Sequence, residues 1–300
     1  MSAHLFLRSS LALFALSSLF SGLVQAETNS KISSTGTISK GEAAKAKTDE
    51  TAAEIIDNHL RFRGGSQNLD EAIRKIKSIQ SLRVEGTIEE RGYSFQTVLY
   101  RAAPDKLRME RSRKNLGWMI TSVTATDGKS VWSQETSPDP LVPQTLTGSP
   151  AMALREDAEF YPIYVDWREN GVVLQYRGEV KIAGQPAQLV KAILPDGRNR
   201  FFYFDKTKFY LVCVGMEDDL AGARIEADIY PTKLERIGGV MIETTWVYRD
   251  QGKAYRTATW TKFEVNPTLD ETLFKMPVVV TTKNAPAAAA VVAPAPATEK

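Results

Sequence analysis

The sequence predicts a mainly β protein with helices, built around one curved antiparallel sheet. Apolar residues alternate with polar ones in short runs between residues 82 and 265, which is typical of strands with one solvated face. Consecutive runs are joined by tight turns, and strands joined in this way pair antiparallel. There are about ten to eleven runs, too many for a flat sheet, so we expect strong curling.

The N-terminus has the pattern of a secretory signal peptide. Arg8 precedes an apolar run over residues 11–24, and small residues end at Ala26. The run is short and broken by serines, which argues against a membrane span, although an uncleaved anchor and a buried helix are the alternatives. We expect residues 1–26 to be removed, leaving an exported, soluble and periplasmic protein that begins at Glu27.

The two ends of the mature chain differ in composition from its middle. Residues 27–50 are polar and predict a flexible leader. Residues 280–300 repeat alanine and proline, which favours extended, disordered chain; this tail is either a spacer that docks a partner or an unstructured end. One domain is left, over residues 51–279.

Helix signals open this domain. Thr51-x-x-Glu54 is a capping box, and Gly64-Gly65 marks the end of the helix that it starts. Asn68 is the expected N-cap of a second helix that runs to Ile79. His59 lies on the apolar face of the first helix with no second ligand in sight, so we interpret it as a packing residue.

Strands and one further helix follow. The strands from Leu82 to Trp132 lead into a polar loop over 133–149. Ser149-Pro150 then predicts a short helix over 149–161, which is either a plain connection or a lid. Strands resume at Val172 and continue to Val265, and Thr268-x-x-Glu271 starts a last short helix.

Composition excludes several classes of function. The 300 residues carry 38 basic and 36 acidic side chains, a net charge of +2 that gives no reason to expect a nucleic-acid partner. A single cysteine, Cys213, allows no intrachain disulfide and no cysteine-ligated zinc site. With two histidines, His4 and His59, the chain lacks the usual material for catalytic or metal sites. We therefore expect no enzyme, no cofactor and no metal, and keep a hydrolase as a remote alternative.

Several strands carry more apolar residues than a half-solvated sheet needs. Phe201, Phe202, Tyr203 and Phe204 occupy both faces of one strand. Either a helix layer covers the second face, or the curved sheet encloses an apolar cavity.

A set of motifs in a fixed order resembles the outer-membrane lipoprotein-sorting protein family, relatives of the periplasmic lipoprotein carrier LolA. The resemblance covers nearly all of residues 51–279. Its motifs are the Gly64-Gly65 helix pair, Val84-Glu85-Gly86-Thr87, Arg101 to Arg108, Asp127 to Trp132, Tyr230, Ile237-Gly238-Gly239-Val240, Asn266 and Leu273-Phe274.

The resemblance implies an unclosed, strongly curved antiparallel β-barrel with helices on its concave side. It also implies a ligand, the acyl chains of a lipid or lipoprotein, held between the sheet and a helical lid. In the best-studied carriers an arginine directly before the proline of this motif holds the lid shut. Here that position is Ala103, and Arg101 lies two residues earlier on the same strand face.

Strand parity predicts which side chains line such a cavity, because apolar members of an alternating strand face away from water. We expect Trp132 at the cavity mouth and Leu154 on the lid. The full predicted set is Val84, Phe95, Leu99, Leu107, Met109, Trp132, Leu154, Ile225 and Ile229.

Two functions fit this fold. The first is a monomeric carrier that shields acyl chains from water, since each methylene buried is worth about 0.8 kcal/mol. The second is a lipid-sensing or envelope-assembly module of the same fold that docks to a protein partner, such as an envelope membrane protein. Lipid that co-purifies with the protein would separate them.

Overall fold

The computed structural model describes residues 47–136, 139–220, 223–250 and 252–278, with the backbone alone over 216–220 and 223–227. The predicted signal peptide, the leader up to residue 46 and the Ala/Pro-rich tail lie outside these ranges. None of the helices within them is long and apolar enough to cross a membrane.

A single 13-stranded antiparallel sheet forms the body of the protein, with strand order β6-β5-β4-β3-β2-β1-β13-β12-β11-β10-β9-β8-β7. The predicted fold class, mainly antiparallel β with helices, is confirmed, with more strands than expected. The strands are β1 Ser81–Glu90, β2 Tyr93–Ala102, β3 Lys106–Asn115, β4 Trp118–Thr126, β5 Val131–Thr136, β6 Gln144–Thr145, β7 Val173–Ile182, β8 Gln185–Ile193, β9 Asn199–Asp205, β10 Leu211–Leu220, β11 Ala223–Ile237, β12 Val240–Asp250 and β13 Lys253–Val265.

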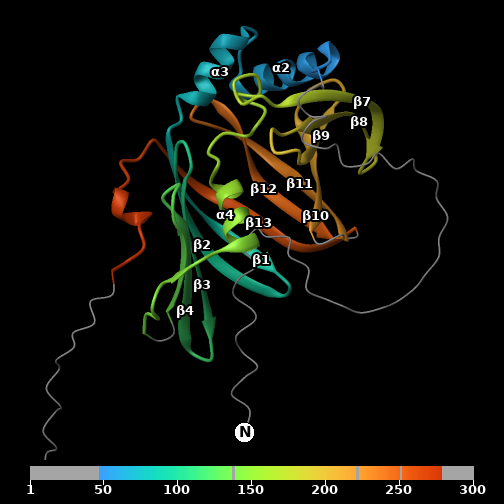
Figure 1. Cartoon of the computed structure of the whole chain (residues 1–300). Coiled ribbons are helices and arrows are strands. Elements are labelled where there is room, and N and C mark those ends of the chain that lie inside the picture. The colour runs from blue at the N-terminus through green and yellow to red at the C-terminus, as the bar shows by residue number, and fades with distance from the viewer. Residues whose placement is uncertain (1–46, 137–138, 221–222, 251, 279–300) are drawn as a thin grey trace, which may run out of the picture.

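The sheet curls strongly but does not close (Figure 1). Its two edges are β6 and β7, which are consecutive in the chain yet lie at opposite ends of the strand order. The segment between them must therefore cross the whole sheet. It crosses on the concave side and carries the helix α4, Gly148–Ala158, into the hollow of the sheet (Figure 1).

Two helices cover one end of the concave side. Helix α2 spans Glu50–Gly64 and α3 spans Leu69–Lys77. The N-cap of α2 is Asp49, whose side chain accepts from the backbone N–H of Ala52, so the expected capping box at Thr51 starts the helix two residues too late. Gly65 ends α2 with a φ of 63°, and Asn68 caps α3, both as the sequence predicts.

The other two helix boundaries differ from the prediction. Helix α4 begins after Thr147 and ends at Ala158, because the N–H of Phe160 bonds to the carbonyl of Pro104 and draws the chain out of the helix. The last helix is a single 3-10 turn, η1, over Glu271–Leu273, and its cap is Asp270, not Thr268.

The concave side holds two apolar clusters. One packs α2 residues such as Ile56 and Leu60 against Phe202 and Phe204. The other packs Leu154 of α4 against neighbouring strands. A helix layer therefore covers much of the surplus apolar surface, and a hollow remains between the two clusters.

Candidate functional site

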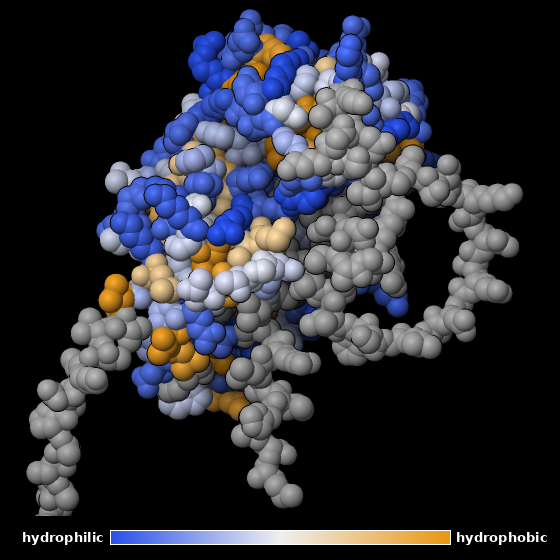
Figure 2. Space-filling model, in the orientation of Figure 1, coloured by the Kyte–Doolittle hydropathy of each residue, from blue (hydrophilic) through white to orange (hydrophobic). Residues whose placement is uncertain are grey.

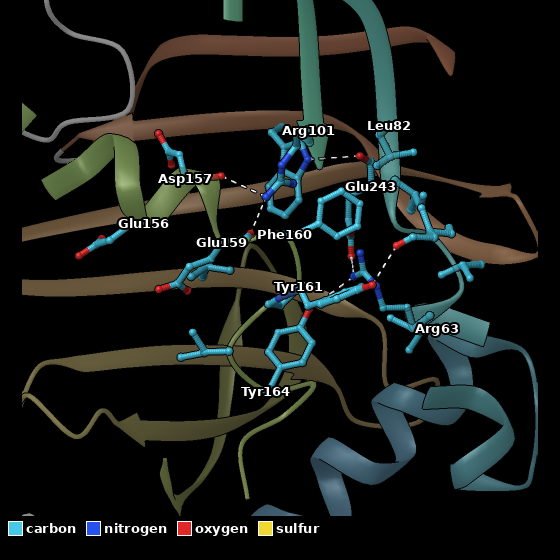
Figure 3. Close-up of a pocket in the computed structure, with 18 of the residues that line it drawn as sticks. Arg63, Leu82, Arg101, Glu156, Asp157, Glu159, Phe160, Tyr161, Tyr164 and Glu243 are labelled. Atoms are coloured by element: carbon cyan, nitrogen blue, oxygen red, sulfur yellow. Dashed lines mark hydrogen bonds and ion pairs between the residues drawn. The ribbon is translucent and has the colours of Figure 1, made fainter. Parts of the chain in front are cut away.

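A cavity of about 390 Å³ lies between the sheet and the segment that leaves α4 (Figure 3). This is within the usual size range of small-molecule sites. Its walls come from α2, α3, the lid segment and strands of both halves of the sheet. The residues that line it include Leu82, Val84, Leu99, Arg101, Glu156, Asp157, Glu159, Phe160, Tyr164, Arg200, Phe202, Ile242, Glu243, Trp246, Trp260 and Phe263.

The floor of the cavity is apolar. Val84 on β1 is paired across the sheet with Leu99 on β2 and with Phe263 on β13. Because directly paired residues share one face, these three side chains form one continuous apolar row. Trp246 and Trp260 extend this surface along β12 and β13. Such a surface favours the apolar part of a ligand.

Arg101 connects the sheet to the end of the lid. Its side chain leaves β2 beside the floor, and its Nη2 donates to the backbone carbonyl of Asp157 at 3.1 Å and to that of Glu159 (Figure 3). Its guanidinium also lies 5.4 Å from the ring centroid of Phe160. A cation at the last carbonyls of a helix also complements the helix dipole. Arg101 therefore holds the lid against β2.

The opposite side of the lid is held by ion pairs. Glu156 of α4 pairs with Arg200 of β9 at 2.8 Å and with Arg198. The C-terminal turn of α4 is thus bound to both halves of the sheet, through its carbonyls on one side and through a carboxylate on the other.

A buried ion pair forms the wall under α2. Arg63 of α2 lies 2.7 Å from Glu243 of β12, and the two side chains are 12% and 4% exposed. Nη1 of Arg63 also donates to the hydroxyl of Tyr164 at 3.4 Å (Figure 3). The pair joins the helix layer, the sheet and the lid segment at one point.

Asp157 is an unusual member of the lining. Its Oδ2 is buried and has no hydrogen-bond partner among the described residues. Burial raises the pKa of Asp157 well above the usual 3.8, against the opposing effects of Arg256 and Arg101. The segment from α4 to Tyr164, which we call the lid for its place over the cavity, therefore has a carboxyl group that favours its neutral form.

His59 and Cys213 are both buried away from the cavity lining. His59 is buried, and its Nδ1 donates to the carbonyl of Phe209 at 2.7 Å. Burial lowers the pKa of His59 to about 3, so it is neutral at physiological pH. Among the described residues, no group of three or more His, Cys, Asp and Glu side chains is placed to hold a metal ion. Cys213 is buried, and burial raises the pKa of its thiol to about 12.

The structure places only some of the predicted cavity residues at the cavity. Val84 and Leu99 line the cavity. Leu107, Met109 and Leu154 are buried in the second apolar cluster, against which Ile229 also packs. Phe95 lies further along β2, where the guanidinium of Arg111 covers its ring at 3.9 Å. The side chain of Ile225 lies outside the described part of the chain.

Trp132 lies elsewhere than expected. It pairs with Ala125 of β4, and the row of paired residues that contains both faces the convex side of the sheet. There Trp132 packs with Val123 and Ala125 in a small apolar cluster. Its Nε1 donates to the carbonyl of Phe274 at 2.9 Å, so the C-terminal segment buries it completely. The expectation of Trp132 at the cavity mouth is corrected: its strand position directs the ring away from the lid.

Sequence reasoning missed the polar members of the site. Arg63 and Glu243 are 180 residues apart in the chain, so no local pattern connects them. Arg101 was the one candidate with a signal, because it shares a strand face with Leu99 and lies two residues from the position where the carriers have their arginine.

Comparisons with known proteins identify the fold. No family model matches the chain, and no curated protein is similar to it in sequence. A DUF1329 family protein from Desulfovibrio piger is similar in structure over 76% of this chain and 98% of that one, with 10% identity and a TM-score of 0.51.

Two further solved structures are similar to a lesser degree. One is described as an outer membrane lipoprotein-sorting protein domain, from Vibrio parahaemolyticus, and covers 77% of this chain and 97% of that one, with 11% identity and a TM-score of 0.47. The other is a LolA superfamily protein from Nitrosomonas europaea, which covers 68% and 95%, with 11% identity and a TM-score of 0.45. At such identities a similarity speaks for the fold and for nothing finer. The described part of the chain thus shares the fold of the DUF1329 family protein, an antiparallel sheet with helices.

Proposed function

We propose that this protein is an exported carrier that shields the acyl chain of a lipid or lipoprotein in the cavity under α4. The observation that carries the proposal is the apolar floor of Val84, Leu99 and Phe263 beneath a lid that is held by side chains. An acyl chain cannot cross water unshielded at a useful rate, since each methylene exposed costs about 0.8 kcal/mol. Shielding requires a surface and a cover, and no reacting group.

The lid supports this function because its attachment can be undone. The contacts of Arg101 with the end of α4, and of Glu156 with β9, are hydrogen bonds and ion pairs at the rim of the cavity. Breaking them, together with the bond from the N–H of Phe160 to the carbonyl of Pro104, frees the end of α4 without disturbing any strand pairing. A ligand can then enter, and the same contacts close over it.

The decisive experiment is mass spectrometry of the protein purified from the envelope of its native host. We expect lipid to co-purify in a stoichiometric amount. A wild-type protein that carries no lipid and binds no fluorescent long-chain fatty acid would contradict the carrier function, and would favour the module that docks to a protein partner.

Two matched variants locate the ligand. Leu99→Trp fills the space above the floor and should abolish binding of the fluorescent fatty acid while the circular dichroism spectrum is unchanged. Leu107→Ala removes a side chain of the second cluster, costs about 2–5 kcal/mol of stability and should leave the affinity nearly unchanged. If Leu107→Ala reduces binding and Leu99→Trp does not, the ligand lies outside the cavity.

A further inference from the structure

The end of the β3–β4 hairpin exposes large apolar side chains. Leu116 is 94% exposed, Trp118 62% and Met119 51%, and Tyr93 of the adjacent β1–β2 hairpin is 58% exposed. We call Leu116, Trp118 and Met119 the hairpin tip. Figure 2 shows hydrophobic residues gathered at this lower end of the molecule, below α4. Contiguous exposed apolar patches on a folded chain can mark an interaction site.

The turn itself contains an unexpected residue. Leu116 adopts a φ of 49° and Gly117 one of 88°, the conformation of a two-residue hairpin turn. The β1–β2 and β7–β8 hairpins have the same geometry, with Arg91 and Ala183 at the corresponding position. This position favours glycine, asparagine or aspartate, so an exposed leucine there lowers both stability and solubility. Nothing in the fold requires a leucine at this position.

The tip is apolar on both faces of the hairpin. Trp118 has the parity of Thr124 and Thr126, whose row faces the concave side. Met119 is paired with Lys114 and faces the convex side. A protein partner usually covers one face of a strand, whereas lipid surrounds whatever enters it. The two-residue turn also leaves few backbone polar groups unpaired, which insertion into an apolar medium requires.

Charge near the tip indicates which kind of membrane it would meet. No acidic residue occurs between Arg111 and Thr126, while Arg113 and Lys114 directly precede the turn. The guanidinium of Arg113 lies 5.0 Å from the ring centroid of Tyr93. Basic residues beside tryptophan and tyrosine are typical of segments that bind the interface of an anionic bilayer.

We propose that the hairpin tip inserts into the interfacial region of an anionic membrane, where it docks the protein. This inference goes beyond the carrier function and does not depend on it. The tip lies six residues along β4 from the row that contains Thr124, Met109 and Leu99, about 20 Å at 3.4 Å per residue, so membrane docking and cavity binding are separable.

Vesicle flotation tests the proposal. The wild-type protein should float with vesicles of phosphatidylglycerol and phosphatidylcholine, and much less with phosphatidylcholine alone. Leu116→Asn should weaken binding on the order of tenfold or more, because the leucine side chain no longer enters the apolar phase. Asparagine suits the turn conformation, so this variant is expected to fold at least as well as the wild type.

Three controls keep the result decisive. Met152→Asn removes another exposed apolar side chain, 56% exposed, from α4 and should leave flotation unchanged. The cavity-filled Leu99→Trp should also float, which separates docking from lipid uptake.

Vesicles should shift the tryptophan emission of the wild type to the blue, and Trp118→Ser should lose that shift. Flotation that is unaffected by Leu116→Asn, or equal for both lipid mixtures, would overturn the proposal, as would a concentration-dependent dimer that the same substitution abolishes.

Discussion

Arg200 of β9 lies 2.8 Å from Glu156 of α4, on the side of the lid opposite Arg101. The last turn of α4 is therefore attached to strands from both halves of the sheet. On the strands, both attachments are made by side chains and not by backbone groups. Opening the cavity requires that both be broken, and each can be tested separately.

We predict that Arg101→Lys loosens the lid more than Glu156→Gln does. Lysine cannot reach both carbonyls at the end of α4, and a hydrogen bond from a charged group contributes about 1.5–3 kcal/mol. Amide hydrogen exchange in α4 should accelerate about tenfold or more. Loss of the partly exposed Glu156 pair should accelerate it only a few-fold, since such pairs contribute about 0.2–1 kcal/mol.

The control for these two variants is Arg83→Lys, because Arg83 pairs with Glu264 on the outer face of β1. It should leave exchange in α4 as in the wild type. Equal acceleration in all three variants would mean that the substitutions destabilise the whole domain and not the lid.

We predict that Asp157→Asn stabilises the protein at neutral pH. The folded-state pKa of Asp157 is raised, so its contribution to stability is present below the unfolded value near 3.8 and is lost as the pH rises through the folded pKa. Asparagine imitates the neutral carboxyl at every pH. The melting temperature of the variant should exceed that of the wild type at pH 7–8 by a few degrees, and the difference should vanish as the pH falls toward about 4.

The exposed Asp139 supplies the control for the substitution itself, since Asp139→Asn makes the same chemical change outside the buried part of the chain. The quantity to compare is the melting temperature of Asp157→Asn minus that of the wild type. If this difference is lower at pH 8 than at pH 5, the carboxylate is charged in the folded state.

His59 should have the opposite effect on stability. Its pKa falls from 6.5 to about 3 on folding, so its contribution is present above pH 6.5 and is lost as the pH falls toward the folded value. At pH 5 the loss amounts to about 2 kcal/mol. In untagged protein that begins at Glu27, His59 is the sole histidine, and its imidazole signals in NMR should not titrate between pH 8 and 5. A midpoint near 6.5 would contradict its burial.

Removal of Glu243 should be strongly destabilising. Glu243→Ala leaves Arg63 buried without its carboxylate, and breaking a buried pair in this way costs about 3–5 kcal/mol in urea unfolding. The exposed pair of Lys233 and Glu235 provides the comparison, and Glu235→Ala should cost less than about 1 kcal/mol. Equal costs would mean that the Arg63 pair is solvated.

Much of the fold could be predicted from local pattern. Alternation between Leu82 and Glu90 gives β1 and its inward face, and Gly65 and Asn68 punctuate the helices through their own backbone and side-chain preferences. Each of these signals acts within a few residues. The helix starts at Thr51 and Ser149 were wrong because several residues nearby can cap, and the choice depends on contacts outside the helix. Asp49, for example, also accepts from the N–H of Tyr176.

The site was less accessible to the same reasoning. Parity identified inward-facing residues such as Val84, Leu99 and Leu107, but could not tell those that face empty space from those that a helix covers. That distinction depends on where α4 crosses the sheet. Trp132 shows a further reason: the segment that buries it, at Phe274, lies 142 residues later in the chain, so no pattern near Trp132 indicates that contact.

The unclosed sheet also bears on the size of ligand that the proposed carrier can hold. In a closed barrel the diameter is fixed by strand number and stagger, and widening it would break a ladder of hydrogen bonds. Here β6 and β7 form the two free ends of the strand order, so the span between them is set by side-chain packing and twist. In the proposed carrier the two edges can therefore move apart around a larger ligand while every strand keeps its neighbours.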